Sequence, residues 1–148
     1  MTSTIFRRIL VGVDGSQTSR SACEMAVGLA LAFRSAVRFV CVIDEARLVS
    51  DFSMGTKRDV GNVVECLTAA AHDVLEEARQ RASSAGVEAD AVLLEGDVVD
   101  RILEAAAEWR ADIIVAGTHA RPQSLHPSLG SKVYELLRRS TLPVLVCR

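Results

Sequence analysis

The chain has 148 residues, of which 49% are hydrophobic and 24% are charged, and its formal net charge is −2 at pH 7. This length and composition are typical of one folded domain with a full hydrophobic core, and they exclude a disordered chain. The weak charge gives no long-range attraction to nucleic acid or to an anionic membrane, and no apolar run reaches the roughly 20 residues that span a bilayer. We therefore expect residues 1–148 to form a single domain that binds neither.

The N-terminal stretch and the cysteine pattern indicate the cellular compartment of the protein. The first apolar segment runs straight into the turn Asp14-Gly15-Ser16 without a small-residue cleavage site, so it lacks the order of a signal peptide. We expect a cytoplasmic protein. The four cysteines form no C-x-x-C pair and the three histidines form no H-E-x-x-H motif. We interpret the cysteines as core or surface thiols and predict no metal site.

Apolar runs alternate with helical periodicity in the first part of the chain. Residues 9–13 form a continuous apolar run that ends at a turn, which predicts a buried strand. Residues 22–33 carry apolar side chains at helical spacing, and residues 37–43 form a second buried, β-branched run. Residues 44–62 have no clear period and mix charges of both signs, so we predict a mobile connection there.

The same alternation continues through the middle of the chain. Residues 64–82 have the pattern of a long amphipathic helix, and Gly86 follows at the position of a left-handed C-cap. Residues 87–95 are predicted to form a third strand. Asp97 is placed to cap a helix that runs through Trp109.

The last part of the chain adds two more strands and one helix. Residues 113–116 are predicted to form a strand, residues 131–139 a helix and residues 143–147 a final strand. Alternating strands and helices predict a parallel sheet that is covered on both faces. Right-handed crossovers favour an open, doubly wound sheet, so the predicted fold class is α/β with five parallel strands.

Two strand ends carry the most unusual chemistry of the sequence. In an open parallel sheet the ligand lies beyond the carboxyl ends of the strands, where the winding reverses. One such end is GVDGS, residues 12–16, and the other is the long stretch that begins at Gly117 and ends at Gly130-Ser131. Glycines and a helix N-terminus suit phosphate, and the Asp14 carboxylate suits the hydroxyls of a ribose.

A purely structural interpretation of both strand ends stays open. Asp14 or Ser16 would then only cap the first helix, and Gly130-Ser131 would be an ordinary helix start. The sequence contains neither a Walker A motif nor G-x-G-x-x-G, so no standard phosphate loop is present. The residues alone therefore predict an α/β domain with a candidate phosphate site.

The chain resembles the universal stress protein family over essentially its whole length. The opening RRILVGVDGSQTSRSACEMA is similar to the family's first strand and helix, and the stretches DIIVAGTHA and LGSKVYELLRRSTLPVLVCR are similar to its last elements. In nucleotide-binding members a loop reads Gly, two residues, Gly, nine residues, then Gly-Ser or Gly-Thr. The matching positions here are Gly117, Ala120 and Gly130-Ser131. The fold we expect is accordingly Rossmann-like, with the strand order 3-2-1-4-5.

The resemblance implies a site for an adenine nucleotide, either ATP or AMP, with Mg²⁺ possible as its companion. Asp14 would hold the ribose, and the glycine loop would hold the phosphates. The implied nucleotide-binding residues are Gly12, Val13, Asp14, Val42, Ala116, Gly117, His119, Ala120, Gly130, Ser131, Lys132 and Val133. The resemblance also implies a homodimer through residues 143–147, in which Cys147 would lie near the interface.

The function implied is that of a dimeric stress-response or regulatory protein rather than a dedicated enzyme. No catalytic residues are predicted, because no base lies beside a nucleophile in the pattern. Slow ATP hydrolysis or self-phosphorylation stays open, with Ser131 or Thr118 as acceptors. An adenylyl transferase is a weaker alternative, since the sequence lacks the His-x-x-His signature.

Two positions depart from the family pattern. Ala120 replaces the second motif glycine and puts a Cβ where the backbone should approach a phosphate. This substitution favours a second hypothesis, a dimeric protein-interaction module of the same family that does not bind nucleotide. Lys132 stands where an apolar residue is commoner, and it would either point to solvent or reach a phosphate.

Overall fold

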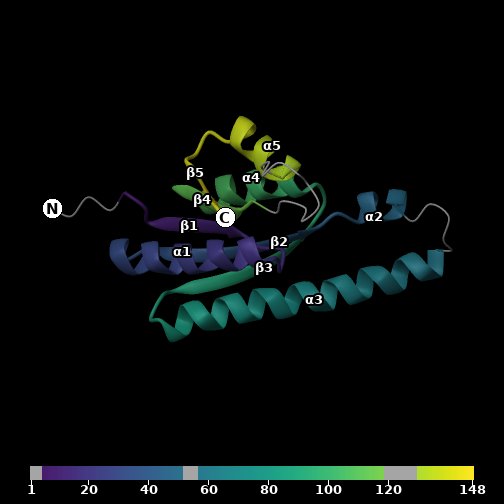
Figure 1. Ribbon diagram of the computed structural model, residues 1–148, viewed down its shortest axis with the longest axis horizontal. Coiled ribbons are helices and arrows are strands. Elements are labelled where there is room, and N and C mark those ends of the chain that lie inside the picture. Colours follow the sequence, from purple (N-terminus) through teal and green to yellow (C-terminus); the bar gives the residue numbers. More distant parts are fainter. Residues whose placement is uncertain (1–4, 52–56, 119–129) are drawn as a thin grey trace.

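The computed structural model describes residues 5–51, 57–118 and 130–148. Within them a central sheet has helices on both of its faces (Figure 1). The elements in chain order are β1 (Arg8–Gly12), α1 (Gln17–Phe33), β2 (Ala36–Ile43), α2 (Glu45–Asp51), α3 (Lys57–Ser84), β3 (Ala89–Glu95), α4 (Val98–Trp109), β4 (Ile113–Gly117), α5 (Ser131–Arg139) and β5 (Val144–Cys147).

The sheet has five strands in the order β3-β2-β1-β4-β5, and every neighbouring pair is parallel. Both the predicted fold class and the predicted strand order are confirmed. The winding reverses at β1, which pairs with β2 on one side and with β4 on the other. Gly12, the last residue of β1, lies opposite Val40 and Ala116, so the switch point of the sheet is at this level.

Each face of the sheet carries its own apolar layer. Ile9 and Val11 of β1 are fully buried on the side of α1 and α3, whereas Leu10 is fully buried on the side of α4 and α5. Successive side chains of a strand point to opposite faces, so a strand covered on both sides needs an unbroken apolar run. This requirement explains why the strands appear in the sequence as continuous runs without alternation.

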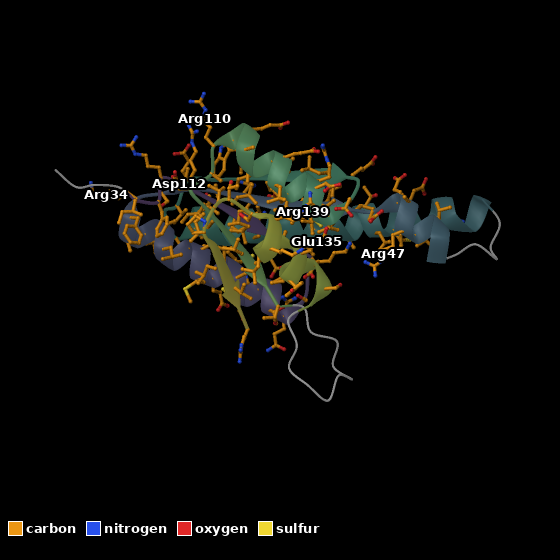
Figure 2. The ribbon with its side chains drawn as sticks, turned by 90° about the horizontal axis from the view of Figure 1, so that it is seen from above. Arg34, Arg47, Arg110, Asp112, Glu135 and Arg139 are labelled. Atoms are coloured by element: carbon orange, nitrogen blue, oxygen red, sulfur yellow. The ribbon has the colours of Figure 1, made fainter. Side chains whose placement is uncertain are left out.

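Four helix boundaries follow simple capping rules. Ser16 and Asp97 cap α1 and α4, because their side-chain oxygens accept hydrogen bonds from the backbone N–H of Ser19 and Asp100. Arg34 and Arg110 end the same helices in the left-handed conformation, each with φ 56°. Figure 2 shows Arg34 and Arg110 at the opposite end of the molecule from Arg47, which lies at the carboxyl end of the sheet.

Gly86 lies just beyond α3 and has φ +85°, as its predicted role requires. The mobile connection predicted over residues 44–62 contains α2 and the start of α3, so the prediction is wrong for these residues, while residues 52–56 lie outside the described residues. The Asp44 carboxylate accepts a hydrogen bond from the Arg47 N–H at 3.0 Å and so fixes the first turn of α2. Leu48 then packs against the apolar layer beneath α1 and α3. Within the described residues, no helix is long and apolar enough to cross a membrane.

Candidate functional site

A cavity of about 260 Å³ opens at the switch point, between the sheet and the helices α4 and α5. Its origin lies in side-chain size along one face of the sheet. On that face Leu10 is followed by Gly12 in β1, and Ile114 is followed by Ala116 in β4. Small residues at the strand ends leave a space that large residues fill further back. Ile102 of α4 bounds this space, since its Cδ1 lies 3.3 Å from where a Cβ on Gly12 would sit.

The walls next to the strand ends are apolar. They consist of Val40 and Val42 from β2, Val98, Val99 and Ile102 from α4, and Val133 and Leu136 from α5. Such a surface suits a flat, uncharged organic group, because binding removes apolar area from water on both partners. Cys41 lies between the two valines of β2 but points to the other face of the sheet. Burial first, and the charge of Asp14 second, raise the pKa of its thiol.

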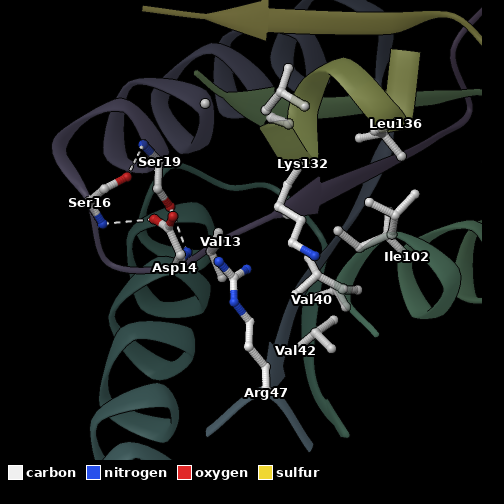
Figure 3. Close-up of a pocket in the computed structure, with 16 residues that line it drawn as sticks. Val13, Asp14, Ser16, Ser19, Val40, Val42, Arg47, Ile102, Lys132 and Leu136 are labelled. Atoms are coloured by element: carbon white, nitrogen blue, oxygen red, sulfur yellow. Dashed lines mark hydrogen bonds between the residues drawn. The ribbon is translucent and has the colours of Figure 1, made fainter. Parts of the chain in front are cut away.

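A polar rim lies where β1 leads into α1. The Asp14 side chain accepts a hydrogen bond from the Ser16 N–H at 2.9 Å, and the Asp14 N–H donates to the Ser19 hydroxyl at 3.1 Å. The Ser16 hydroxyl in turn accepts from the Ser19 N–H at 3.2 Å. Ser16 is therefore the N-cap of α1, while Asp14 orders the turn that precedes it. The same three residues line the cavity, as Figure 3 shows.

Two cations enter the cavity from different elements. Lys132, in the first turn of α5, directs its ammonium group into the space, and Arg47 of α2 extends its guanidinium toward Asp14 (Figure 3). The Lys132 Nζ lies 3.9 Å from Asp97 Oδ2, which is an ion pair but too long for a hydrogen bond. Lys132 lines the cavity, and its side chain is also 35% exposed to solvent.

Gly117 has a packing role that the sequence did not indicate. A Cβ at this position would lie 2.5 Å from the carbonyl carbon of Thr18 and 2.7 Å from the nitrogen of Ser19. These distances are far below a van der Waals contact, so the end of β4 approaches the first turn of α1 only because residue 117 is a glycine. Its backbone still borders the cavity. The requirement for glycine at this position thus comes from the fold as well as from any ligand.

The N-terminus of α5 lies beside the cavity. Gly130 is the N-cap of this helix without a side-chain hydrogen bond, and its N–H donates to the Thr118 carbonyl at 2.9 Å. Gly130 and Ser131 do not belong to the cavity lining formed by the described residues, whereas Lys132 and Val133 do. His119 and Ala120 lie outside the described residues.

The structure therefore brings most of the predicted residues together. The expected residues that line the cavity are Gly12, Val13, Asp14, Val42, Ala116, Gly117, Lys132 and Val133. The lining residues outside the predicted nucleotide-binding set are Ser16, Ser19, Val40, Arg47, Val98, Val99, Ile102 and Leu136. A signal existed for the α4 residues, because the apolar face of that helix starts directly after Asp97 at a strand end. No signal pointed to Arg47.

An open parallel sheet with a partly apolar, partly cationic cavity at its switch point is typical of α/β proteins that bind small ligands. The family can also be stated. The family model described as "Universal stress protein family" matches residues 5–148, and the chain belongs to this family.

Two curated relatives match over nearly the whole chain. The Universal stress protein MJ0531 of Methanocaldococcus jannaschii is 27% identical over 144 residues, which cover 97% of this chain and 83% of the relative. The Universal stress protein YxiE of Bacillus subtilis is 27% identical over 148 residues, which cover 97% of this chain and 100% of the relative.

Solved structures give the same result. A protein from the universal stress protein family of Burkholderia pseudomallei is 31% identical with a TM-score of 0.77, and the match covers 96% of each chain. A universal stress protein solved in complex with cAMP is 25% identical with a TM-score of 0.72, over 97% of each chain. The universal stress protein from Archaeoglobus fulgidus, in complex with dAMP, shares the fold, with a TM-score of 0.69, 22% identity and coverage of 97% of this chain and 99% of that one.

Proposed function

We propose that this universal stress protein binds an adenine nucleotide, ATP or AMP, in the cavity at its switch point. The observation that carries the proposal is the meeting of three unlike surfaces in one cavity. Valines from β2 and α4 suit a base, the Asp14 carboxylate suits ribose hydroxyls, and Lys132 with the N-terminus of α5 suits phosphate. Relatives solved with cAMP and with dAMP support an adenine nucleotide as the class of ligand.

In this proposal the remaining family positions serve the same ligand. Gly12, Val13, Ala116 and Gly117 present backbone to it at the strand ends, and Val42 packs against the base. Gly130, Ser131 and Val133, together with His119 and Ala120, belong to the segment assigned to the phosphates. Within the described residues no group of three or more acidic, histidine or cysteine side chains could hold a metal ion. In this proposal any Mg²⁺ arrives bound to the phosphates of ATP.

We further propose a regulatory homodimer in the cytoplasm whose role is binding rather than turnover. β5 is an edge strand of the sheet, and an unpaired apolar edge favours pairing with a second copy. The cysteines are all free, which suits a reducing compartment. Sedimentation at tens of micromolar, a rough working range, should give a dimer, and a monomer alone would contradict pairing through residues 143–147.

The test of the nucleotide site begins with the purified protein and with Asp14. Mass spectrometry of ligand released from fresh protein should show an adenine nucleotide. Asp14→Asn keeps a side-chain oxygen that can accept from the Ser16 N–H but loses the negative charge, whereas Asp14→Ala loses both. If the carboxylate holds the ribose, both variants lose affinity for ATP in calorimetry, and Asp14→Ala, which also loses the acceptor of the Ser16 N–H, is less stable than Asp14→Asn by about 1 kcal/mol. Unchanged affinity together with lower stability of Asp14→Ala would show that Asp14 orders the turn and does not hold the ribose.

A further inference from the structure

The charged groups around the cavity are distributed unevenly. Among the described residues of its lining, Arg47 and Lys132 are basic and Asp14 is acidic. A second, open hollow adjoins the cavity at Arg47, and acidic residues line it at the carboxyl ends of β2 and β3, including Asp44, Glu95 and Asp97. The acidic side chains therefore repel an anion from the second hollow, whereas Lys132 and Arg47 attract it within the cavity.

Lys132 is held at the edge of the cavity without being neutralised. Its ammonium is 3.9 Å from Asp97 Oδ2, and both side chains are partly exposed, at 35% and 42%. An exposed pair at this distance contributes little to stability. The other oxygen of Asp97, Oδ1, accepts a hydrogen bond from the Asp100 N–H at 3.0 Å. This bond holds the carboxylate in place when the Lys132 ammonium moves. The ammonium can leave Asp97 for a better anion inside the cavity, whereas Asp97 stays at the N-cap of α4.

Arg47 approaches from another wall of the cavity. The backbone of this residue is fixed by the bond from its N–H to the Asp44 carboxylate, and Leu48 anchors the same helix to the core. Within the described part of the chain, no hydrogen bond or ion pair engages its guanidinium. The side chain thus brings to the cavity a positive charge that no described side chain pairs with. A guanidinium binds phosphate oxygens well because its donors form a planar fork.

We propose that Lys132 and Arg47 select phosphorylated ligands in this cavity, and that Asp97 weakens the selection by competing with phosphate for the Lys132 ammonium. The inference rests on the proposed adenine-nucleotide function and assigns the preference of that same site. A ligand with a chain of phosphates gains from both cations, whereas the bare nucleoside contacts only the valines and Asp14. The ratio of the ATP affinity to the adenosine affinity therefore measures how much Lys132 and Arg47 contribute to binding the phosphates.

The experiment is calorimetric titration of the full chain with ATP and with adenosine at fixed magnesium and salt. Lys132→Gln and Arg47→Gln should each lower the ratio of ATP to adenosine affinity about tenfold, the loss of one charge-assisted hydrogen bond. Arg138→Gln is the matched control, because Arg138 is an exposed cation on the same helix as Lys132 and is absent from the cavity lining. This control should leave the ratio unchanged.

Asp97→Asn tests the competition. Asparagine is as good an N-cap as aspartate, so α4 keeps its cap while the negative charge is lost. The ATP affinity should rise roughly two- to fivefold, the size of an exposed ion pair. In the double variant with Lys132→Gln this gain should disappear. An equal gain in the original protein and in the Lys132→Gln variant would overturn the competition. The effect would then come from the long-range repulsion between the Asp97 charge and ATP.

The titrations distinguish a failure of the proposed selection by Lys132 and Arg47 from a failure of the proposed nucleotide site. If the protein binds ATP and adenosine but Lys132→Gln and Arg47→Gln keep the original ratio, the selection by these cations is overturned and the nucleotide site stands. If the protein binds neither ligand, the proposed function is overturned, and the inference that rests on it falls with it.

Discussion

Replacing Gly117 with alanine should destabilise the fold even when no ligand is present. The new Cβ would lie 2.5 Å from the Thr18 carbonyl carbon, 2.6 Å from the Thr18 hydroxyl oxygen and 2.7 Å from the Ser19 nitrogen. Two of these three atoms belong to the backbone of α1, so a rotamer change cannot relieve the overlap. Either β4 or the first turn of α1 must shift, and both are packed in the core. Overpacking typically costs about 1–3 kcal/mol, and we expect the upper end here.

A loss of about 3 kcal/mol is a large share of the 5–15 kcal/mol that holds a typical domain together. For a chain of this length it lowers the melting temperature by about 6–12 °C. Gly28→Ala is the matched control, because a Cβ at Gly28 of α1 meets nothing within 4 Å. Alanine in a helix interior is more favourable than glycine, so this variant should gain about 0.5–1 kcal/mol. Urea unfolding followed by circular dichroism measures both variants. A free energy of unfolding for Gly117→Ala within about 0.5 kcal/mol of the original protein would refute the packing argument.

Two other predictions concern α1. Ser16→Ala removes the N-cap acceptor of the Ser19 N–H and should lower the free energy of unfolding by about 1 kcal/mol. Ser21→Ala, inside the same helix, is the control and should be neutral or slightly stabilising. Equal melting temperatures for the two variants would contradict the capping role. Burial raises the pKa of the Cys23 thiol from 9.0 to about 12, so between these values the unfolded chain loses a proton that the folded chain keeps. The free energy of unfolding should therefore fall as the pH rises from about 9, and Cys23→Ala should fall less steeply over the same range. Parallel pH profiles of the two proteins would show that the pKa of the Cys23 thiol is the same in the folded and the unfolded chain.

The fold was predictable because burial on both sides of a parallel sheet leaves a strong trace in the sequence. A strand such as β1 must be apolar wherever it is buried, from Ile9 to Val11, and the helices between the strands need one apolar face each. The long α3 was foreseen from its periodic part but begins earlier than predicted. α2, with 7 residues, is too short to show a helical period, and its start depends on the Asp44 carboxylate. The error over residues 44–62 therefore follows from the length of the element.

The candidate site was only partly predictable, and the missing part has a common cause. Asp14 and Lys132 stand at a strand end and a helix start, where sequence position alone indicates a place near the cavity. Arg47 belongs to α2, which follows the end of β2, and its long side chain reaches the cavity from that helix. Ile102 lines the cavity because small residues on β1 and β4 leave room in front of it. Such relations depend on contacts between distant segments, and a local pattern does not contain them.

The residues around this cavity fall into two groups with different experimental value. Asp14, Ser19 and Gly117 belong to the cavity and also hold the junction between β1, β4 and α1 together. A substitution there changes stability and binding at once, so a lost affinity reports on the ligand only where a matched variant, such as Asp14→Asn, keeps the hydrogen bond of the junction. Arg47 and Lys132 add charge to the cavity without supporting the apolar core. Changes in affinity at these two positions therefore report on the ligand itself, and they are the substitutions from which the chemistry of the site can be determined.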